Sequence, residues 1–576
     1  MNTRGGAWAA VLVMGCAAAL WPSALAGQGD SVPEAERRKV EAAVPTRAPA
    51  RARKPRRLLI YDANVGYPGH PSRFVGNLAF ALMGRKTGAF ETTVSRDPAI
   101  FAPESLKHFD AVFLNNTVGN LFEDAVLRQS LADFVYGGGG LMGCHGTSVA
   151  FTRWTEGAKE DWPEFAAMLG ARGAAHQAQD EPVQVRLEEP DHPLLAAFGG
   201  RDFQHSDEFF RFGDPYSRKR VRVLLSMDNG ATARLQGVDR VKQFRPDDDY
   251  ALAWVRRWGR GRVFYTTLGH NARVFQDPRL LRFWLAAAQY ALGDLDAPAT
   301  PSALLTPAVR AQEQLGWRLG VEAYTFHRFT LFEAIEKTAS LGIPWMGGLS
   351  FQKVSSGIPR GLEPGLTDEE IRQVRMKLDA EGVRLVTYYI QEIPGDEAGC
   401  RRVFEFARKL GIEAFMTEPK PESLDTIEKF ADQYGIDVGL HNHDQKASPH
   451  YWSPDAILTV TRGRSRRIGA AADVGYWMRS GIDPVAGIRK LGSRLITLQL
   501  HDLHSTGIEG HDVPWGTGAG RTEELLREMR RMRIRPALVG LEYSHKFEDN
   551  LEEVAQCARF FARVALDLAR TAPGGR

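Results

Sequence analysis

The feature that most constrains this chain is an eightfold alternation of short apolar segments and helical segments over residues 315–570. Each apolar segment has the length and composition of a buried strand, and a helical stretch separates it from the next. The expected strands are RLGVEAY (318–324), IPWMGGL (343–349), VRLVTYY (383–389), EAFMTEP (413–419), IDVGLHNH (436–443), IGAAADVG (468–475), LITLQLHD (495–502) and ALVGLEYS (537–544). Eight strand–helix units in roughly 250 residues predict a (β/α)8 barrel.

Acidic residues and histidines stand at the ends of five successive expected strands. They are Glu418, His441, His443, Asp473, His501, Asp502 and Glu542. Because barrel closure brings the carboxyl ends of the strands around one mouth, we expect these side chains to lie close together. Carboxylate oxygens and imidazole nitrogens suit a divalent metal such as Mn, Mg, Co or Zn, and the absence of cysteine argues against a structural zinc.

The segment VGLHNHDQK (438–446) allows two interpretations. In a strand, His441 and His443 point to the same side, where both could bind a metal. Alternatively, one histidine of such an isolated pair makes a structural hydrogen bond and the other is exposed to solvent. The acids at the neighbouring strand ends favour a ligand role for His441.

This region resembles the xylose-isomerase-like TIM-barrel superfamily of sugar (phosphate) isomerases, ketose epimerases and inosose dehydratases. The motifs are EPKPE (418–422), HNHD (441–444), DVGYWMRSG (473–481), LQLHD (498–502), HDVPWGTG (511–518) and GLEY (540–543). The resemblance implies a metal site made by His441, Asp473, the LQLHD strand and Glu542. On that strand we favour His501 as the ligand, because a neutral amide binds metal more weakly, and Gln499 is the alternative. The chain also has Tyr476 where the superfamily often has histidine.

The resemblance also implies the chemistry, which begins with removal of a proton next to a carbonyl and needs a base and a nearby cation. Glu418, His443 and Glu542 are the candidate bases. Lys420, Gln499, His511 and Trp515 are the expected substrate contacts. EPKPE further resembles a subset of the superfamily associated with 3-keto-glycosides, so isomerisation and β-elimination are both open.

The region 55–293 forms a separate α/β domain. Apolar runs at RLLIYDA (57–63) and DAVFLNN (110–116) alternate with helical stretches near 74–83 and 123–136, followed by GGGGLMGCHGTS (137–148). This order predicts a parallel sheet with helices on both faces and a ligand site beyond the carboxyl ends of its strands. GRGR (259–262) lacks the spacing of a dinucleotide-binding loop, and turn formation explains it.

The segment GGGGLMGCHGTS has the form of a nucleophile elbow, in which Cys144 and His145 compete for the exposed position. Together with HSDEFF (205–210) and WVRRWGRGRVFYTTLGH (254–270), it resembles the ThuA-like (trehalose utilisation) family, relatives of the class I glutamine amidotransferases. The resemblance implies a flavodoxin-like three-layer domain, an exposed His145 and an inward Cys144. It offers His145, His176, Glu208 and His270 as candidate pocket residues that bind substrate, and for each of them a structural hydrogen bond is the alternative.

The chain begins with a charged residue, an apolar stretch and an Ala-Leu-Ala site before Gly27, which predicts a signal peptide over 1–26 and a periplasmic or secreted protein. The lipoprotein alternative at Cys16 is weaker, because methionine precedes Gly15. We expect a disordered linker over 27–54, a second linker over 294–314 and a barrel over 315–570. No later stretch has the length of a membrane span, and three remaining cysteines make no disulfide framework.

Together these features predict an exported, metal-dependent carbohydrate enzyme acting on a small sugar or glycoside. The 73 basic and 70 acidic residues give no electrostatic reason for nucleic acid binding, which disfavours the apurinic-endonuclease alternative that the barrel allows. A non-catalytic carbohydrate-binding or scaffold protein is the non-enzymatic alternative. The barrel resemblance also suggests a homodimer.

Overall fold

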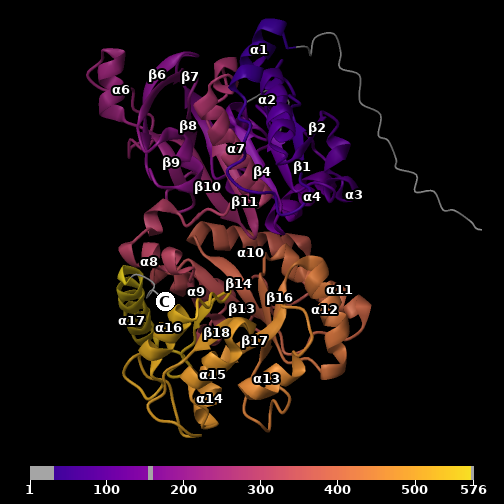
Figure 1. Ribbon diagram of the computed structural model, residues 1–576, viewed down its shortest axis with the longest axis vertical. Helices are drawn as coiled ribbons and strands as arrows, with labels where there is room; N and C mark the ends of the chain where they lie inside the picture. The colour runs from indigo at the N-terminus through magenta and orange to yellow at the C-terminus, as the bar shows by residue number, and fades with distance from the viewer. Residues whose placement is uncertain (1–31, 154–159, 572–576) are drawn as a thin grey trace, which may run out of the picture.

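The computed structural model describes residues 32–153 and 160–571, which form two domains, one above the other in Figure 1. The predicted signal peptide and residues 27–31 of the predicted linker lie outside the described residues. Within the two described ranges, no helix is both long and apolar enough to cross a lipid bilayer.

A nine-stranded sheet forms the centre of the N-terminal domain, in the order β2-β1-β3-β4-β11-β10-β9-β6-β7. Five neighbouring strands run parallel, as the sequence predicted. They are β2 (Glu91–Ser95), β1 (Arg57–Tyr61), β3 (Ala111–Leu114), β4 (Gly140–Cys144) and β11 (Gly261–Thr266).

The other four strands extend this sheet in antiparallel fashion, which the sequence did not reveal. They are β10 (Ala251–Trp258), β9 (Arg222–Met227), β6 (Glu181–Leu187) and β7 (Phe203–Asp207). The turn between β10 and β11 lies in the GRGR segment, where Gly259 has a φ of 56°. A separate two-stranded sheet pairs β5 (Arg172–His176) with β8 (Phe210–Gly213).

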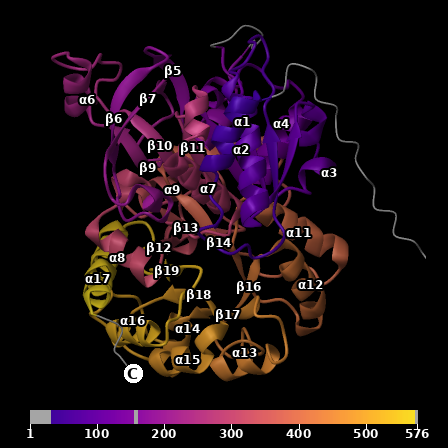
Figure 2. The same ribbon diagram turned by 45° about the horizontal axis from the view of Figure 1, so that its top comes forward.

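Helices cover both faces of the large sheet and give three layers (Figure 2). Leu58 and Ile60 of β1 face a core shared with α2 (Ser72–Thr87) and α7 (Pro278–Leu292). The alternate residues, Leu59 and Tyr61, face the core under α4 (Ala125–Tyr136) and α5 (Pro163–Leu169). This period of two in a fully buried strand is what a sheet covered on both sides requires.

The C-terminal domain is a closed eight-stranded parallel barrel, and all eight expected strands are present. They are β12 (Leu319–Glu322), β13 (Trp345–Leu349), β14 (Arg384–Tyr389), β15 (Ala414–Thr417), β16 (Asp437–His441), β17 (Ile468–Asp473), β18 (Leu495–Leu500) and β19 (Val539–Leu541). The surrounding helices are α9 (Leu331–Ser340), α10 (Asp368–Glu381), α11 (Glu397–Lys409), α12 (Leu424–Tyr434), α13 (Pro454–Val460), α14 (Val474–Arg479), α15 (Pro484–Leu491), α16 (Thr522–Arg531) and α17 (Leu551–Arg570). The predicted fold class is therefore confirmed.

Both expected linkers contain ordered helices, which corrects the predicted disorder of the first. Helix α1 (Glu34–Ala43) packs on α2, and Val40 is completely buried there. Helix α8 (Pro307–Leu315) packs on α17, so the barrel domain begins within the second predicted linker. A polar segment with few apolar residues can form a stable helix when the adjoining domain supplies a surface that covers those residues.

The domain interface lies at the amino ends of the strands in both domains. Arg375 of α10 donates to Asp133 at 2.6 Å, and Arg260 donates to the Gly435 carbonyl at 2.8 Å. Arg384, at the start of β14, donates to the Gly259 carbonyl at 3.2 Å. The carboxyl ends of the barrel strands and of β4 therefore point away from the interface, toward opposite ends of the molecule.

Candidate functional sites in the two domains

The barrel brings together the acids and histidines predicted at its strand ends. Asp473, His501 and Glu542 form one group that could hold a metal ion, and Glu418, His441 and His443 form another. Within each group, one ligand atom from each residue lies within 4.8 Å of the others. His441 joins the groups, because its Nε2 lies 3.8 Å from Asp473 Oδ2.

Asp473 is held so that one carboxylate oxygen faces the cluster. Its Oδ1 accepts the backbone N–H of Tyr476 and caps α14, while Oδ2 faces His441 and His501. The side-chain amide of Asn442 bonds both the N–H and the carbonyl of Asp473, which ties the ends of β16 and β17 together. Asn442, which lies between His441 and His443 in the sequence, therefore fixes the position of the Asp473 backbone.

His501 is oriented by a second carboxylate. Its Nδ1 pairs with Asp512 at 2.8 Å, and its Nε2 lies 3.6 Å from Asp473 and 4.0 Å from Glu542. That Nε2 is buried and has no hydrogen-bond partner in the described part of the chain. A carboxylate on the far nitrogen is the arrangement that commonly orients a metal-binding histidine.

Gln499 contacts the same cluster from within β18. Its amide nitrogen donates to Glu542 at 2.7 Å, and its buried oxygen makes no hydrogen bond within residues 32–153 and 160–571. The choice between Gln499 and His501 as ligand stays a prediction. The Asp512 contact favours His501, and the bond to Glu542 gives Gln499 a positioning role.

His441 and His443 both turn toward one carboxylate, as their alternation in the sequence indicated. Glu418 Oε1 lies 3.0 Å from His441 Nδ1 and 2.5 Å from His443 Nδ1. Burial would raise the pKa of Glu418, but hydrogen bonds from the two imidazoles outweigh it and bring the pKa to about 2. Burial would lower the pKa of His441, yet Asp473 and Glu418 raise it to about 9.

Glu322, at the end of β12, belongs to this site and was missed. It is 2 % exposed, and burial, followed by the negative charge of Glu542, raises its pKa to about 8. Burial likewise raises the pKa of Glu542. The sequence did contain a sign of this role. Glu322 is a charged residue in the otherwise apolar strand RLGVEAY (318–324), and such a residue in a buried barrel strand is a candidate to face the barrel interior.

Two of the expected substrate contacts lie at the surface and one lies in the core. Lys420 is exposed, and His511 is exposed and stacks on His504 with ring centroids 4.0 Å apart. Trp515 is 3 % exposed and packs in the core near Phe561 of α17, and its expected contact with substrate stays a prediction. A tryptophan in a loop motif carries no sequence signal that separates packing from ligand contact.

The elbow of the N-terminal domain forms after β4. His145 occupies the sharp turn with a φ of 39°, and Cys144 packs inward, fully buried, as expected. Burial raises the pKa of the Cys144 thiol, which makes it a poor nucleophile. The expectation that His145 is exposed is wrong, because His70, His270 and Phe210 pack around its ring and leave it 0 % exposed.

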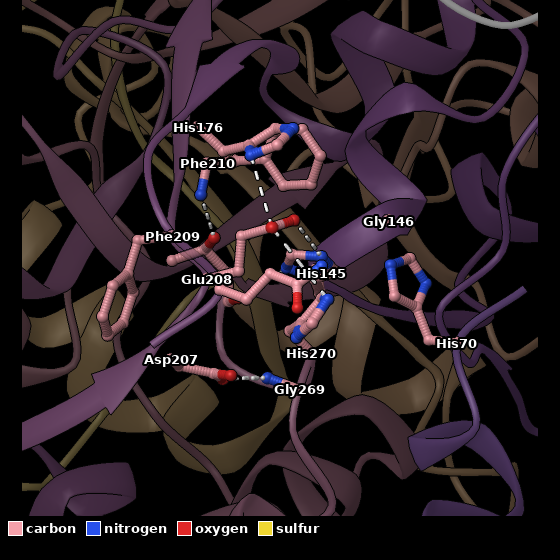
Figure 3. Close-up of polar contacts among 12 residues, drawn as sticks. His70, His145, Gly146, His176, Asp207, Glu208, Phe209, Phe210, Gly269 and His270 are labelled. Atoms are coloured by element: carbon pink, nitrogen blue, oxygen red, sulfur yellow. Dashed lines mark hydrogen bonds and ion pairs between the residues drawn. The ribbon is translucent and has the colours of Figure 1, made fainter. Parts of the chain in front are cut away.

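The four predicted residues of this domain do converge. Glu208 lies between His176 and the rings of His145 and His270, with His70 beyond them (Figure 3). The Glu208 carboxylate is 3.4 Å from His145 Nε2, 3.4 Å from His176 Nδ1 and 4.0 Å from His270 Nε2. His176 is the most exposed of the three, at 39 % of its side chain.

Asp207 fixes the position of His270. It is fully buried and accepts the backbone N–H groups of Gly269 and Asn271, each at 2.9 Å (Figure 3). In the HSDEFF motif, Asp207 thus holds the loop that carries His270, and the next residue, Glu208, faces the histidine cluster. Burial lowers the pKa of His145, and burial together with His145 and His270 lowers the pKa of His70 to about 3.

His70 was missed by the sequence reasoning. It follows β1 in the YPGH segment (67–70), and its ring lies 4.9 Å from that of His145 and 5.0 Å from that of His270. The loop after β1 lies beside the loops after β3 and β4 in a parallel sheet, so a histidine there was a recoverable candidate.

The fold and the two clusters define a two-domain α/β protein with a polar site at the carboxyl ends of the strands in each domain. Residues 57–291 match the model of the trehalose utilisation (ThuA) family, and residues 335–563 match that of the xylose isomerase-like TIM barrel. The chain therefore joins a ThuA domain to a xylose isomerase-like TIM barrel, as its motifs indicated. Among curated proteins, none matches it.

Three solved structures illustrate the similarity. An uncharacterised protein from Parabacteroides distasonis is 28 % identical, with a TM-score of 0.36, over 43 % of this chain and 99 % of that one. A xylose isomerase-like TIM barrel protein from Mycobacterium smegmatis, in complex with magnesium, is 12 % identical, with a TM-score of 0.36, over 44 % and 98 %. D-psicose 3-epimerase in the presence of D-fructose is 17 % identical, with a TM-score of 0.34, over 45 % and 100 %.

Proposed function

We propose that the barrel is a divalent-metal-dependent sugar isomerase or epimerase that removes a proton from the carbon next to a carbonyl. The observation that carries this proposal is the convergence of His441, Asp473, His501 and Glu542 on one point at the barrel mouth. The family of the barrel supports a sugar isomerase or epimerase type of fold.

The donor atoms fit a divalent ion. Two carboxylates and two imidazoles offer a mixed oxygen and nitrogen set suited to Mn, Mg, Co or Zn. His501 Nε2 is a buried nitrogen without a hydrogen-bond partner among the described residues, and Asp473 presents one oxygen after committing the other to a helix cap. When bound, the ion supplies a Lewis acid that stabilises negative charge on a substrate oxygen.

We assign the base to His443, with Glu418 as the residue that positions it. Glu418 is a weak base because its pKa is about 2, and Glu542 is engaged by Gln499. The Nδ1–H of His443 donates to Glu418, which leaves Nε2 with a lone pair. The His443 ring is half-buried and packs edge-on against Tyr476 at 4.7 Å, which holds its orientation.

In this scheme His443 takes a proton from the carbon next to the carbonyl and returns it. Return to the former carbonyl carbon, with the hydroxyl proton passing to the other oxygen, gives an isomer, whereas an epimer requires a second acid that delivers a proton to the opposite face while His443 keeps the first. A substituent on the next carbon can leave instead, which is the β-elimination expected for a 3-keto-glycoside. Ketoses and 3-keto-glycosides are therefore the proposed substrates, and the predicted export and homodimer belong to the same proposal.

The test is deuterium exchange followed by NMR. The full chain is freed of metal with a chelator, resupplied with Mn²⁺ or Mg²⁺, and incubated in D2O with a simple ketose or a 3-keto-glucoside. We expect metal-dependent exchange at the carbon next to the carbonyl. His443→Gln should slow it by about 10²–10⁴-fold, the range of a general base, while metal uptake persists.

His450→Gln is the matched control, because His450 is an exposed histidine in the loop that follows the same strand. Its exchange rate should equal that of the unchanged chain. Exchange that is independent of metal, or equally fast in His443→Gln, would remove the proposal.

A further inference from the structure

We infer that the N-terminal domain holds its own divalent metal, with zinc as the best fit, bound by His70, His145, Glu208 and His270. This inference does not depend on the proposed function of the barrel. The four residues come from three loops and one strand end, and one ligand atom from each lies within 4.8 Å of the others (Figure 3).

The distances fit a zinc site that needs only small adjustment. Zinc bonds of about 2.0–2.1 Å in a tetrahedron place ligand atoms about 3.4 Å apart. His145 Nε2 lies 3.4 Å from Glu208 Oε1, and His270 Nε2 lies 4.0 Å from Glu208 Oε2. The ring centroids of His70, His145 and His270 are 4.9, 5.0 and 5.1 Å apart, so all three imidazoles surround one small volume.

The hydrogen bonding leaves nitrogens available for the ion. His145 Nδ1 faces the Thr267 carbonyl at 3.3 Å, which favours the proton on that nitrogen and a lone pair on Nε2. His145 Nε2 and His70 Nδ1 are buried and have no hydrogen-bond partner among the described residues, and His270 Nε2 lies 4.0 Å from Glu208 Oε2, beyond hydrogen-bond distance. A divalent cation between these nitrogens and the Glu208 carboxylate would give each buried acceptor atom a partner.

The supporting contacts resemble those of a built metal site. The elbow turn places His145 with a φ of 39°, in the left-handed region that only a well-packed turn imposes on a residue other than glycine. Asp207 holds the backbone on both sides of His270, and the Tyr67 hydroxyl contacts His70 Nε2 at 3.2 Å.

The donor set distinguishes this metal from that of the barrel. Three imidazoles with one carboxylate favour zinc over magnesium or manganese, which prefer oxygen ligands. His176 Nδ1 contacts Glu208 from the outer side and also faces the Gln177 carbonyl at 3.1 Å, so we place it next to the metal and outside its ligand set.

The experiment separates this site from the barrel. The full chain carrying Asp473→Asn and Glu542→Gln is freed of metal and titrated with Zn²⁺ and, in parallel, with Co²⁺. We expect this background to bind about one equivalent of zinc, and its Co²⁺ form to show the strong visible absorption of a four- or five-coordinate site.

Adding His70→Gln or Glu208→Gln to that background should weaken zinc binding by at least about 100-fold and remove the Co²⁺ absorption. Adding His205→Gln is the matched control, since His205 is a half-buried histidine of β7 outside the cluster, and it should change neither. Circular dichroism verifies that each variant is folded, and the two ligand variants guard against one of them failing to fold. Absence of zinc uptake by the background, or uptake that both ligand variants leave unchanged, overturns the inference.

Discussion

The two clusters lie at opposite ends of the molecule and differ in their ratio of carboxylates to imidazoles. In the barrel, Glu418, Asp473 and Glu542 match three histidines, and Asp473 with Glu418 raises the pKa of His441 to about 9. In the N-terminal domain one carboxylate faces several histidines, and burial with the neighbouring rings lowers the pKa of His70 to about 3. His441 therefore holds a proton more firmly than a free imidazole does, and His70 holds one less firmly.

This difference shows that burial alone does not set the protonation state of a histidine. Both sites are buried at the ends of parallel strands, and desolvation opposes the imidazolium in each. The number of nearby carboxylates decides the sign of the shift. Because the domains meet at the amino ends of their strands, the two clusters lie on opposite sides of the interface.

The largest expected effect is on barrel turnover. Glu542→Gln removes a charge from the proposed metal site while keeping the side-chain shape, so we expect activity to fall by about 10³-fold or more and the barrel to lose its metal. Sugar turnover and elemental analysis measure this. Glu405→Gln, at an exposed carboxylate of α11, is the control and should be unchanged. Normal turnover in Glu542→Gln would contradict the assignment of the barrel as the metal-dependent site.

A smaller effect on metal binding is expected at Asp512, the carboxylate that pairs with His501 Nδ1. Asp512→Asn keeps the size of the side chain but loses the carboxylate that orients Nδ1, so Mn²⁺ affinity should fall by about 10–100-fold. Calorimetric titration of the metal-free protein measures it. Equal affinity in Asp512→Asn and the unchanged chain would favour Gln499 over His501 as the ligand.

The third prediction uses pH to compare the clusters in metal-free protein. The pKa of His441 is raised to about 9, so its stabilising contribution is full below about 6.5 and is lost as pH rises toward 9. The pKa of His70 is lowered to about 3, so its contribution is full above about 6.5 and is lost as pH falls toward 3.

Histidine NMR titration with parallel thermal unfolding measures both windows. His70→Gln should reduce the loss of stability on the acid side and leave the alkaline side unchanged. An alkaline loss that disappears in His70→Gln would show that the two clusters are coupled, contrary to their separation in the fold.

The smallest expected effect is at Glu322. Its pKa of about 8 makes it a neutral acid at pH 7, and Glu322→Gln reproduces that neutral state. We expect turnover at pH 7 to change by less than about threefold, whereas Glu542→Gln is severe. A severe loss in Glu322→Gln would place this carboxylate among the groups that act while charged.

The sequence by itself determined the two domains, the eight barrel strands and most of the barrel cluster. The period of apolar segments identifies strands, and closure of the barrel forces their ends together, so His441, Asp473 and Glu542 could be placed without coordinates. The inward Cys144 also followed from the sequence, through its resemblance to the ThuA family.

Only the tertiary structure decided how the side chains meet. The burial of His145, the part played by His70, the core position of Trp515 and the support of His501 by Asp512 depend on loops far apart in the chain. Loop residues carry no periodic pattern, and their partners are chosen by packing between segments. The antiparallel extension of the sheet and the docking of α1 were decided in the same way, because short segments gain their stability from surfaces that other parts of the chain provide.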